Sequence, residues 1–123
     1  MLNLLYVDDD EDLRELVGFA LRLDADIAVT VVPSGAEALA LLDAGAAFDV
    51  VLLDVMMPDM DGPGVLAGMR QRPPWASTPV IFVTARALPE EIQRLRDLGA
   101  AEVITKPFDP ISIAADVRGE LAR

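Results

Sequence analysis

Five short β-type runs, separated by helical patterns, constrain the fold of this 123-residue chain more than any other feature. The third and fourth runs contain "VVLL" and "VIFV", which are continuously apolar instead of alternating. Such runs are typical of parallel strands that are covered on both faces. The pattern predicts strands over five ranges: Leu2–Val7, Ile27–Val32, Asp49–Leu53, Pro79–Val83 and Ala101–Thr105.

Helix start and stop signals lie between these runs. Ser34 and Glu37 have the spacing of a capping box, and Gly45 follows as a stop. Asp61 is a candidate cap for a helix that ends near Arg72. Other helices are predicted to begin at Pro89 and after Asp109–Pro110. Inward-facing positions are predicted at Leu13, Leu16, Val17, Ala20 and Leu21 of the first helix, at Ile92, Leu95 and Leu98, and at Ile113, Ala114, Val117 and Leu121.

The order of these elements is five βα units in a row, with no linker or repeat. Units of this kind fold into a five-stranded parallel sheet with helices on both faces, the doubly wound (βα)5 class of α/β folds. The length is that of one domain, residues 1–123. Ligands of such folds bind beyond the carboxyl ends of the strands, at a topological switch point.

The composition excludes several classes of function. The chain has no His and no Cys, so a serine–histidine triad and thiolate metal sites are ruled out. A net charge of −11 argues against direct binding to nucleic acid. No apolar stretch approaches the roughly 20 residues of a membrane span, and no secretory signal is visible. We therefore expect a cytoplasmic protein that does not bind membranes.

Polar residues follow four of the five predicted strands, at the point where each strand ends. Asp8 and Asp9 follow the first run, and Asp54 follows the third. The fourth run leads to Thr84 and the fifth to Lys106. Because the carboxyl ends of parallel strands meet at one edge of a sheet, we expect these side chains to lie close together.

A cluster of three carboxylates needs a counter-ion, since close like charges push at least one pKa upward. Oxygen-only ligands suit Mg²⁺, and Lys106 can balance part of the remaining charge. Lys106 is the only lysine beside nine arginines, which suggests that this position needs a compact ammonium. A carboxylate beside two such cations is a good nucleophile towards phosphorus.

Four motifs carry a family resemblance: "VDDD", "LLDVMMPDMDG", "VTA" and "KPF". In this order and spacing the chain resembles the receiver domain of two-component response regulators, the CheY-like superfamily with its flavodoxin-like fold. The similarity extends over essentially all 123 residues. It implies that Asp54 is the phosphoacceptor and that Thr84 and Lys106 contact the phosphoryl group. It also implies a Mg²⁺ site formed by Asp8, Asp9, Asp54 and the backbone carbonyl of Met56.

Other positions bear on how the domain signals. The family usually has Tyr or Phe three residues before the lysine, whereas this chain has Val103. Valine has no ring to swing inward, so we expect the aromatic half of the family's conformational switch to be weakened. The resemblance also makes the Lys106–Pro107 bond a candidate cis bond. Met56 and Arg86 stand where the family places residues that orient water, and neither can act as a base, so we expect slow autodephosphorylation.

The leading functional hypothesis is a module that accepts a phosphoryl group from a histidine kinase or phosphotransfer protein. It would signal by phosphorylation-dependent binding to a downstream protein and would have no enzymatic activity beyond Mg²⁺-dependent self-phosphorylation and its reversal. The alternatives are a pseudo-receiver scaffold and a receiver module cut from a hybrid kinase. A haloacid-dehalogenase-like phosphatase is disfavoured because it needs an Asp where this chain has Met56.

Overall fold

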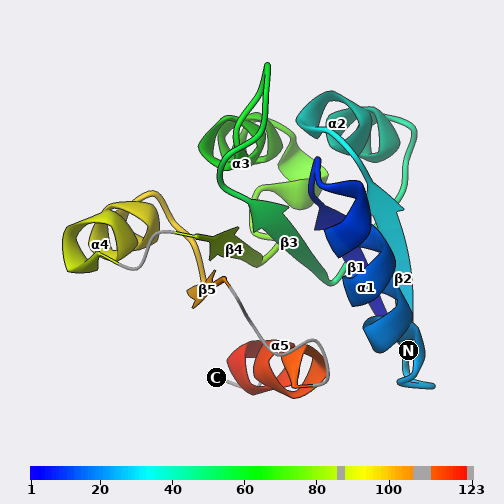
Figure 1. Cartoon of the computed structure of the whole chain (residues 1–123). Helices are drawn as coiled ribbons and strands as arrows, with labels where there is room; N and C mark the ends of the chain where they lie inside the picture. Colours follow the sequence, from blue (N-terminus) through cyan, green and yellow to red (C-terminus); the bar gives the residue numbers. More distant parts are fainter. Residues whose placement is uncertain (86–87, 107–111, 122–123) are drawn as a thin grey trace.

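The computed structural model describes residues 1–85, 88–106 and 112–121. Within these ranges, five strands alternate with five α-helices (Figure 1). The elements are β1 (Leu2–Val7), α1 (Glu11–Arg22), β2 (Ile27–Val32), α2 (Gly35–Asp43), β3 (Val50–Asp54), α3 (Gly62–Arg70), the 3₁₀ turn η1 (Pro73–Trp75), β4 (Val80–Thr84), α4 (Pro89–Asp97), β5 (Glu102–Thr105) and α5 (Ile113–Leu121). None of the described helices combines the length and apolar character needed to cross a membrane.

The strands form one parallel sheet in the order β2-β1-β3-β4-β5. From β1 the chain moves outward to β2 and then returns across β1 to β3. The strand order therefore reverses between β1 and β3, and this is the topological switch point of the fold. The predicted doubly wound (βα)5 class is confirmed.

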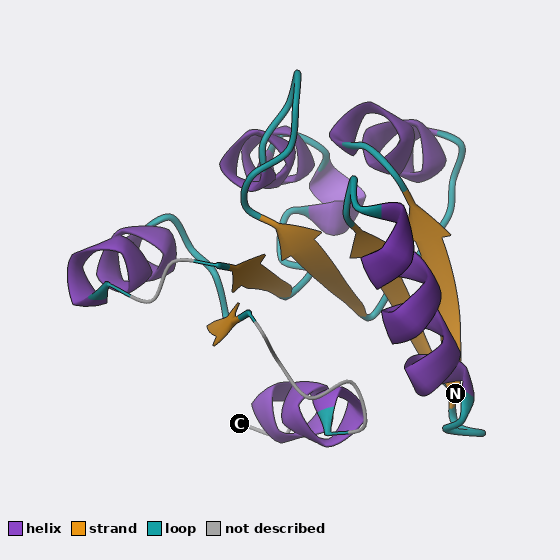
Figure 2. Ribbon diagram, viewed as in Figure 1, coloured by secondary structure: helices purple, strands orange, loops and turns teal. Residues whose placement is uncertain are grey.

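Helices cover both faces of the sheet (Figure 2). On one face, α2, α3 and α4 pack on alternate strand residues to form one buried cluster. On the other face, α1 and α5 pack on the remaining strand residues to form a second cluster. Trp75 of η1 is partly buried and packs against the first cluster. Two-sided coverage explains why all five residues of β3 and of β4 are buried.

The helix termini follow the predicted signals. Ser34 and Asp61 accept hydrogen bonds from backbone N–H groups in the first turns of α2 and α3, at 3.2 and 2.8 Å. Gly45 and Gly99 follow α2 and α4 with φ of +98° and +108°, a conformation that glycine adopts without strain. The predicted cap at Asp109–Pro110 lies outside the described residues.

Two apolar positions do not face the core as predicted. Leu16 is 51% exposed, because α1 meets the sheet through Val17 and Leu21, and Leu16 lies at the margin of this contact. Leu98 is 46% exposed, because it follows the last residue of α4 as its C-cap. The helical spacing of apolar residues therefore predicted a buried stripe that is wider than the helix surface in contact with the sheet.

Candidate functional site

The carboxyl ends of β1, β3, β4 and β5 bring the predicted residues to one edge of the sheet. Asp8 directly follows β1, and Asp54 is the last residue of β3. Thr84 is the last residue of β4, and Lys106 directly follows β5. Asp8 and Thr84 are buried, and Asp54 is only 5% exposed. The edge includes the switch point between β1 and β3, which is where ligands bind in this class of fold.

Three carboxylates converge at this edge. One oxygen from each of Asp8, Asp9 and Asp54 lies within 4.8 Å of the other two. Asp9 is exposed, whereas Asp8 and Asp54 are buried, so the cluster faces solvent on the Asp9 side. All-oxygen donors at this spacing suit a hard divalent cation.

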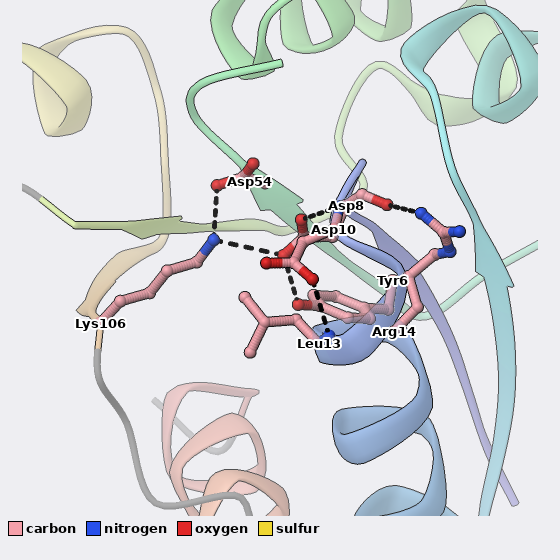
Figure 3. Close-up of polar contacts among 7 residues, drawn as sticks. All are labelled: Tyr6, Asp8, Asp10, Leu13, Arg14, Asp54 and Lys106. Carbon is pink, nitrogen blue, oxygen red and sulfur yellow. Dashed lines mark hydrogen bonds and ion pairs between the residues drawn. The ribbon is translucent and has the colours of Figure 1, made fainter.

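Lys106 supplies the positive charge beside this cluster (Figure 3). Its Nζ lies 3.0 Å from Asp54 Oδ1 and 3.3 Å from Asp8 Oδ2. The Lys106 side chain is 19% exposed, so solvent screens these two contacts less than it would at the surface. Three ionised carboxylates and one ammonium leave an excess of two negative charges, which one divalent cation would balance.

The surroundings shift the pKa values of both ion-pair partners upward. The pKa of Asp54 is raised from its ordinary 3.8 to about 6. Burial is the main cause and the negative charge of Asp8 adds to it, whereas the contact with Lys106 lowers this pKa. Burial lowers the pKa of Lys106, but its contacts with Asp54 and Asp8 outweigh this effect, and the pKa is raised overall. Lys106 therefore remains an ammonium at neutral pH.

Asp8 is held from three directions by groups that the sequence reasoning missed. The Tyr6 hydroxyl donates to Asp8 Oδ2 at 2.6 Å, and the Asp10 N–H donates to Oδ1 at 2.9 Å. The Arg14 guanidinium donates to the backbone oxygen of Asp8 at 2.9 Å. Burial and the Asp8 carboxylate raise the pKa of Tyr6, so its phenol stays protonated as a donor. A signal for Tyr6 was present, since residues two apart in a strand share a face.

The start of α1 accommodates the rest of the acidic run. Asp10 is the N-cap and accepts a hydrogen bond from the Leu13 N–H at 3.2 Å, as Figure 3 shows. Glu11 and Asp12 lie in the first turn. Negative side chains are favourable there because the N-terminus of a helix carries a partial positive charge.

The loop between β3 and α3 brings the start of α3 close against the end of β3. The Gly62 N–H donates to the Val55 carbonyl at 3.0 Å. A Cβ at Gly62 would lie 2.7 Å from the carbonyl oxygen of Asp54, so a side chain at this position would displace the strand end. Met56, in the same loop, has a side chain that is 71% exposed.

The remaining sequence expectations fall away from this cluster or outside the described residues. Val103 lies in β5 and packs against the cluster formed with α2, α3 and α4, opposite Phe82 of β4. The weakened aromatic switch therefore stays a prediction. Arg86 and the Lys106–Pro107 bond lie outside the described residues.

Known proteins resemble this chain along its whole length. A model of the family described as "Response regulator receiver domain" matches residues 4–118. Sensory transduction protein RegX3 of Mycobacterium tuberculosis is 40% identical over 125 residues, which cover 100% of this chain and 52% of RegX3. The chain thus spans about half the length of this curated relative.

Solved structures agree with this similarity. Chemotaxis protein CheY4 of Vibrio cholerae superposes with a TM-score of 0.88 at 33% identity, over 97% of this chain and 98% of CheY4. The receiver domain of the Francisella response regulator 1452 superposes with a TM-score of 0.89 at 28% identity, over 100% of this chain and 98% of that domain. The sheet order, the acidic edge and the match over residues 4–118 lead to the same conclusion: the chain belongs to the family of response regulator receiver domains.

Proposed function

We propose that residues 1–123 act as one receiver domain that accepts a phosphoryl group on Asp54 from a histidine kinase or phosphotransfer protein. The phosphorylated form would then bind a downstream protein. The observation that carries this proposal is the position of Asp54. One oxygen of this buried carboxylate lies 3.0 Å from Lys106 Nζ. An Asp54 oxygen also lies within 4.8 Å of one oxygen from each of Asp8 and Asp9.

Asp8, Asp9, Asp54 and the backbone carbonyl of Met56 would hold Mg²⁺. The all-oxygen donor set and the excess negative charge at this edge support this assignment. When bound, Mg²⁺ supplies positive charge that stabilises the oxygens of the phosphoryl group during transfer.

In the proposed reaction a lone pair of the Asp54 carboxylate attacks the phosphorus of a phosphohistidine. The O–P bond forms while the P–N bond breaks, and the imidazole leaves and takes up a proton from solvent. Lys106 would contact a phosphoryl oxygen, a role supported by its 3.0 Å contact with Asp54. Thr84 would offer its hydroxyl from the neighbouring strand, in keeping with its position at the end of β4.

Intact mass measurement tests the proposal. With Mg²⁺ and a small phosphodonor such as acetyl phosphate, the chain should gain one phosphoryl group through a bond that is stable in acid and labile in base. Peptide mapping should locate the group on Asp54. A chain that never gains the group would be a pseudo-receiver scaffold, and an adduct at another residue would refute the Asp54 assignment.

Mg²⁺ should raise the melting temperature of the chain in the millimolar range, because a ligand that binds only the folded state stabilises it. At about ten times the dissociation constant the gain is about 1.4 kcal/mol, which corresponds to about 5 °C for a domain of this size. Asp9→Ala should remove most of this gain, because it removes one of the three converging carboxylates. Differential scanning fluorimetry across a Mg²⁺ titration measures the effect.

Asp12→Ala is the matched control for this titration. Asp12 belongs to the same acidic run, but it lies exposed in the first turn of α1. Its removal changes the net charge by the same amount and should leave the Mg²⁺ effect intact. If both variants lose the effect equally, Mg²⁺ acts through diffuse surface charge instead of a site.

A further inference from the structure

Tyr6 is a buried polar residue that the proposed function leaves without a role. It is the only tyrosine in the chain, and its side chain is fully buried. Its ring belongs to the cluster formed with α1 and α5. Its hydroxyl lies at the acidic edge, where it points towards Asp8 (Figure 3). The ring is thus in the core while its polar end reaches the site.

A continuous series of contacts runs from Tyr6 to the proposed phosphoacceptor. The Tyr6 hydroxyl lies 2.6 Å from Asp8 Oδ2, and Lys106 Nζ lies 3.3 Å from the same oxygen. Lys106 also lies 3.0 Å from Asp54 Oδ1. Tyr6 therefore lies nearer to Asp8 Oδ2 than Lys106 does, and Lys106 is closer to Asp54 than to Asp8.

These bonds fix the orientation of the Asp8 carboxylate. Oδ2 accepts from Tyr6, and Oδ1 accepts from the Asp10 N–H at 2.9 Å. Rotation of the carboxylate about its Cβ–Cγ bond would break both bonds inside a buried site. A carboxylate has about four lone-pair sites, so it can accept these bonds and still offer an oxygen to a cation.

We propose that Tyr6 is a positioning residue for the acidic site, whose hydroxyl orients Asp8 towards Mg²⁺ and leaves Lys106 on Asp54. This inference rests on the Mg²⁺ site of the proposed function. Without the hydroxyl, the buried Asp8 carboxylate loses the nearer of the donors that contact its Oδ2. Lys106, which already contacts this oxygen at 3.3 Å, would then move closer to Asp8 and away from Asp54, because a buried carboxylate oxygen that has lost its shorter hydrogen bond is poorly satisfied.

Tyr6→Phe tests the inference, since it deletes the hydroxyl and keeps the ring that packs in the core. The dissociation constant for Mg²⁺ alone, measured by isothermal titration calorimetry, should rise about tenfold, the effect typical of removing a partner of a metal-ligating group. The rate of phosphorylation by acetyl phosphate at saturating Mg²⁺ should also fall, because Lys106 is displaced from Asp54.

Leu4→Val is the matched control for packing. Leu4 is a buried residue of β1 on the same face as Tyr6, in the same cluster and two residues farther from the site. This variant should lower the melting temperature while its Mg²⁺ dissociation constant stays within about twofold of wild type. A purely structural role for Tyr6 would move the melting temperature in both variants and the Mg²⁺ affinity in neither.

The two proposals fail in different ways. If wild-type protein binds no Mg²⁺, the metal site itself is wrong, and this inference falls with it. If wild type binds Mg²⁺ and Tyr6→Phe binds it equally well, the site stands and only the role of the hydroxyl is wrong. Melting curves of each variant show that the compared proteins are folded.

Discussion

Asp54→Asn should abolish phosphorylation of the chain and also stabilise the metal-free protein at neutral pH. The substitution removes the proposed nucleophile, so no phosphoryl group should appear in intact mass spectra with Mg²⁺ and acetyl phosphate. It also removes a buried negative charge beside Asp8, whereas the amide oxygen of Asn can still accept from Lys106. The raised pKa of Asp54, about 6 against an ordinary 3.8, corresponds to a gain of about 3 kcal/mol in the free energy of unfolding.

This gain should depend on pH in a definite direction. The Asp54 carboxyl binds its proton more tightly in the folded chain than in the unfolded chain, because its folded pKa is raised. Between about pH 4 and 6 the folded state therefore holds more protons, and the unfolding free energy of wild type falls as pH rises. Above about pH 6 the unfolding free energy of wild type no longer falls through Asp54, because this carboxyl is ionised in both states. Asp54→Asn should lack this slope, and urea denaturation at a series of pH values measures it.

Asp12→Asn is the control, because it removes an equal charge from an exposed position in α1. Its stability should stay within about 1 kcal/mol of wild type across the pH range, the size expected for one charge near a helix N-terminus. If the unfolding free energies of Asp54→Asn and wild type differed by the same amount at pH 4 and pH 8, burial of a charged Asp54 would not be the cause of the stability difference. A phosphoryl adduct that survived in Asp54→Asn would contradict the phosphoacceptor assignment.

Lys106→Met should destabilise the metal-free chain by about 3 kcal/mol at pH 8, because it leaves two buried carboxylates without their counter-charge. The lysine ammonium lies within 3.3 Å of both Asp54 and Asp8, and its side chain is 19% exposed. The loss should shrink as pH falls towards 6, because Asp54 without Lys106 binds its proton at a higher pH than it does in wild type. Phosphorylation should fall sharply as well, because the transferring oxygens lose a cation. Denaturant melts and intact mass spectra measure the two effects.

Lys106→Arg and Arg94→Met serve as controls for this result. Lys106→Arg keeps the charge, so much of the stability should return, but a planar guanidinium differs from an ammonium that reaches two oxygens, and phosphorylation should remain slow. Arg94→Met breaks the exposed i,i+3 pair with Glu91 and should change stability little. If Lys106→Met and Arg94→Met have equal effects, the pair at the acidic edge is no stronger than a surface pair.

Most of the fold could be predicted from the sequence. Two-sided burial makes the third and fourth β-runs continuously apolar, and the caps and glycines mark where helices begin and end. Alternating βα units leave few topologies, because crossovers between parallel strands are right-handed. Because all the strands run in the same direction, their carboxyl ends lie at one edge of the sheet. This alone places Asp8, Asp54, Thr84 and Lys106 at that edge. The ends of β3 and β4 lie one residue later in the structure than the sequence predicted, so Asp54 and Thr84 belong to these strands.

Only the tertiary structure decided how these side chains meet. The bonds from Tyr6 to Asp8 and from Lys106 to both carboxylates depend on rotamers and on the spacing of strands far apart in sequence. The same holds for the exposed Leu16, because the width of contact between α1 and the sheet is a property of packing. A sequence pattern specifies which face a residue shares and which edge it reaches. Distances of 3 Å and the burial that shifts the pKa of Asp54 arise only when all the strands and their covering helices are in place.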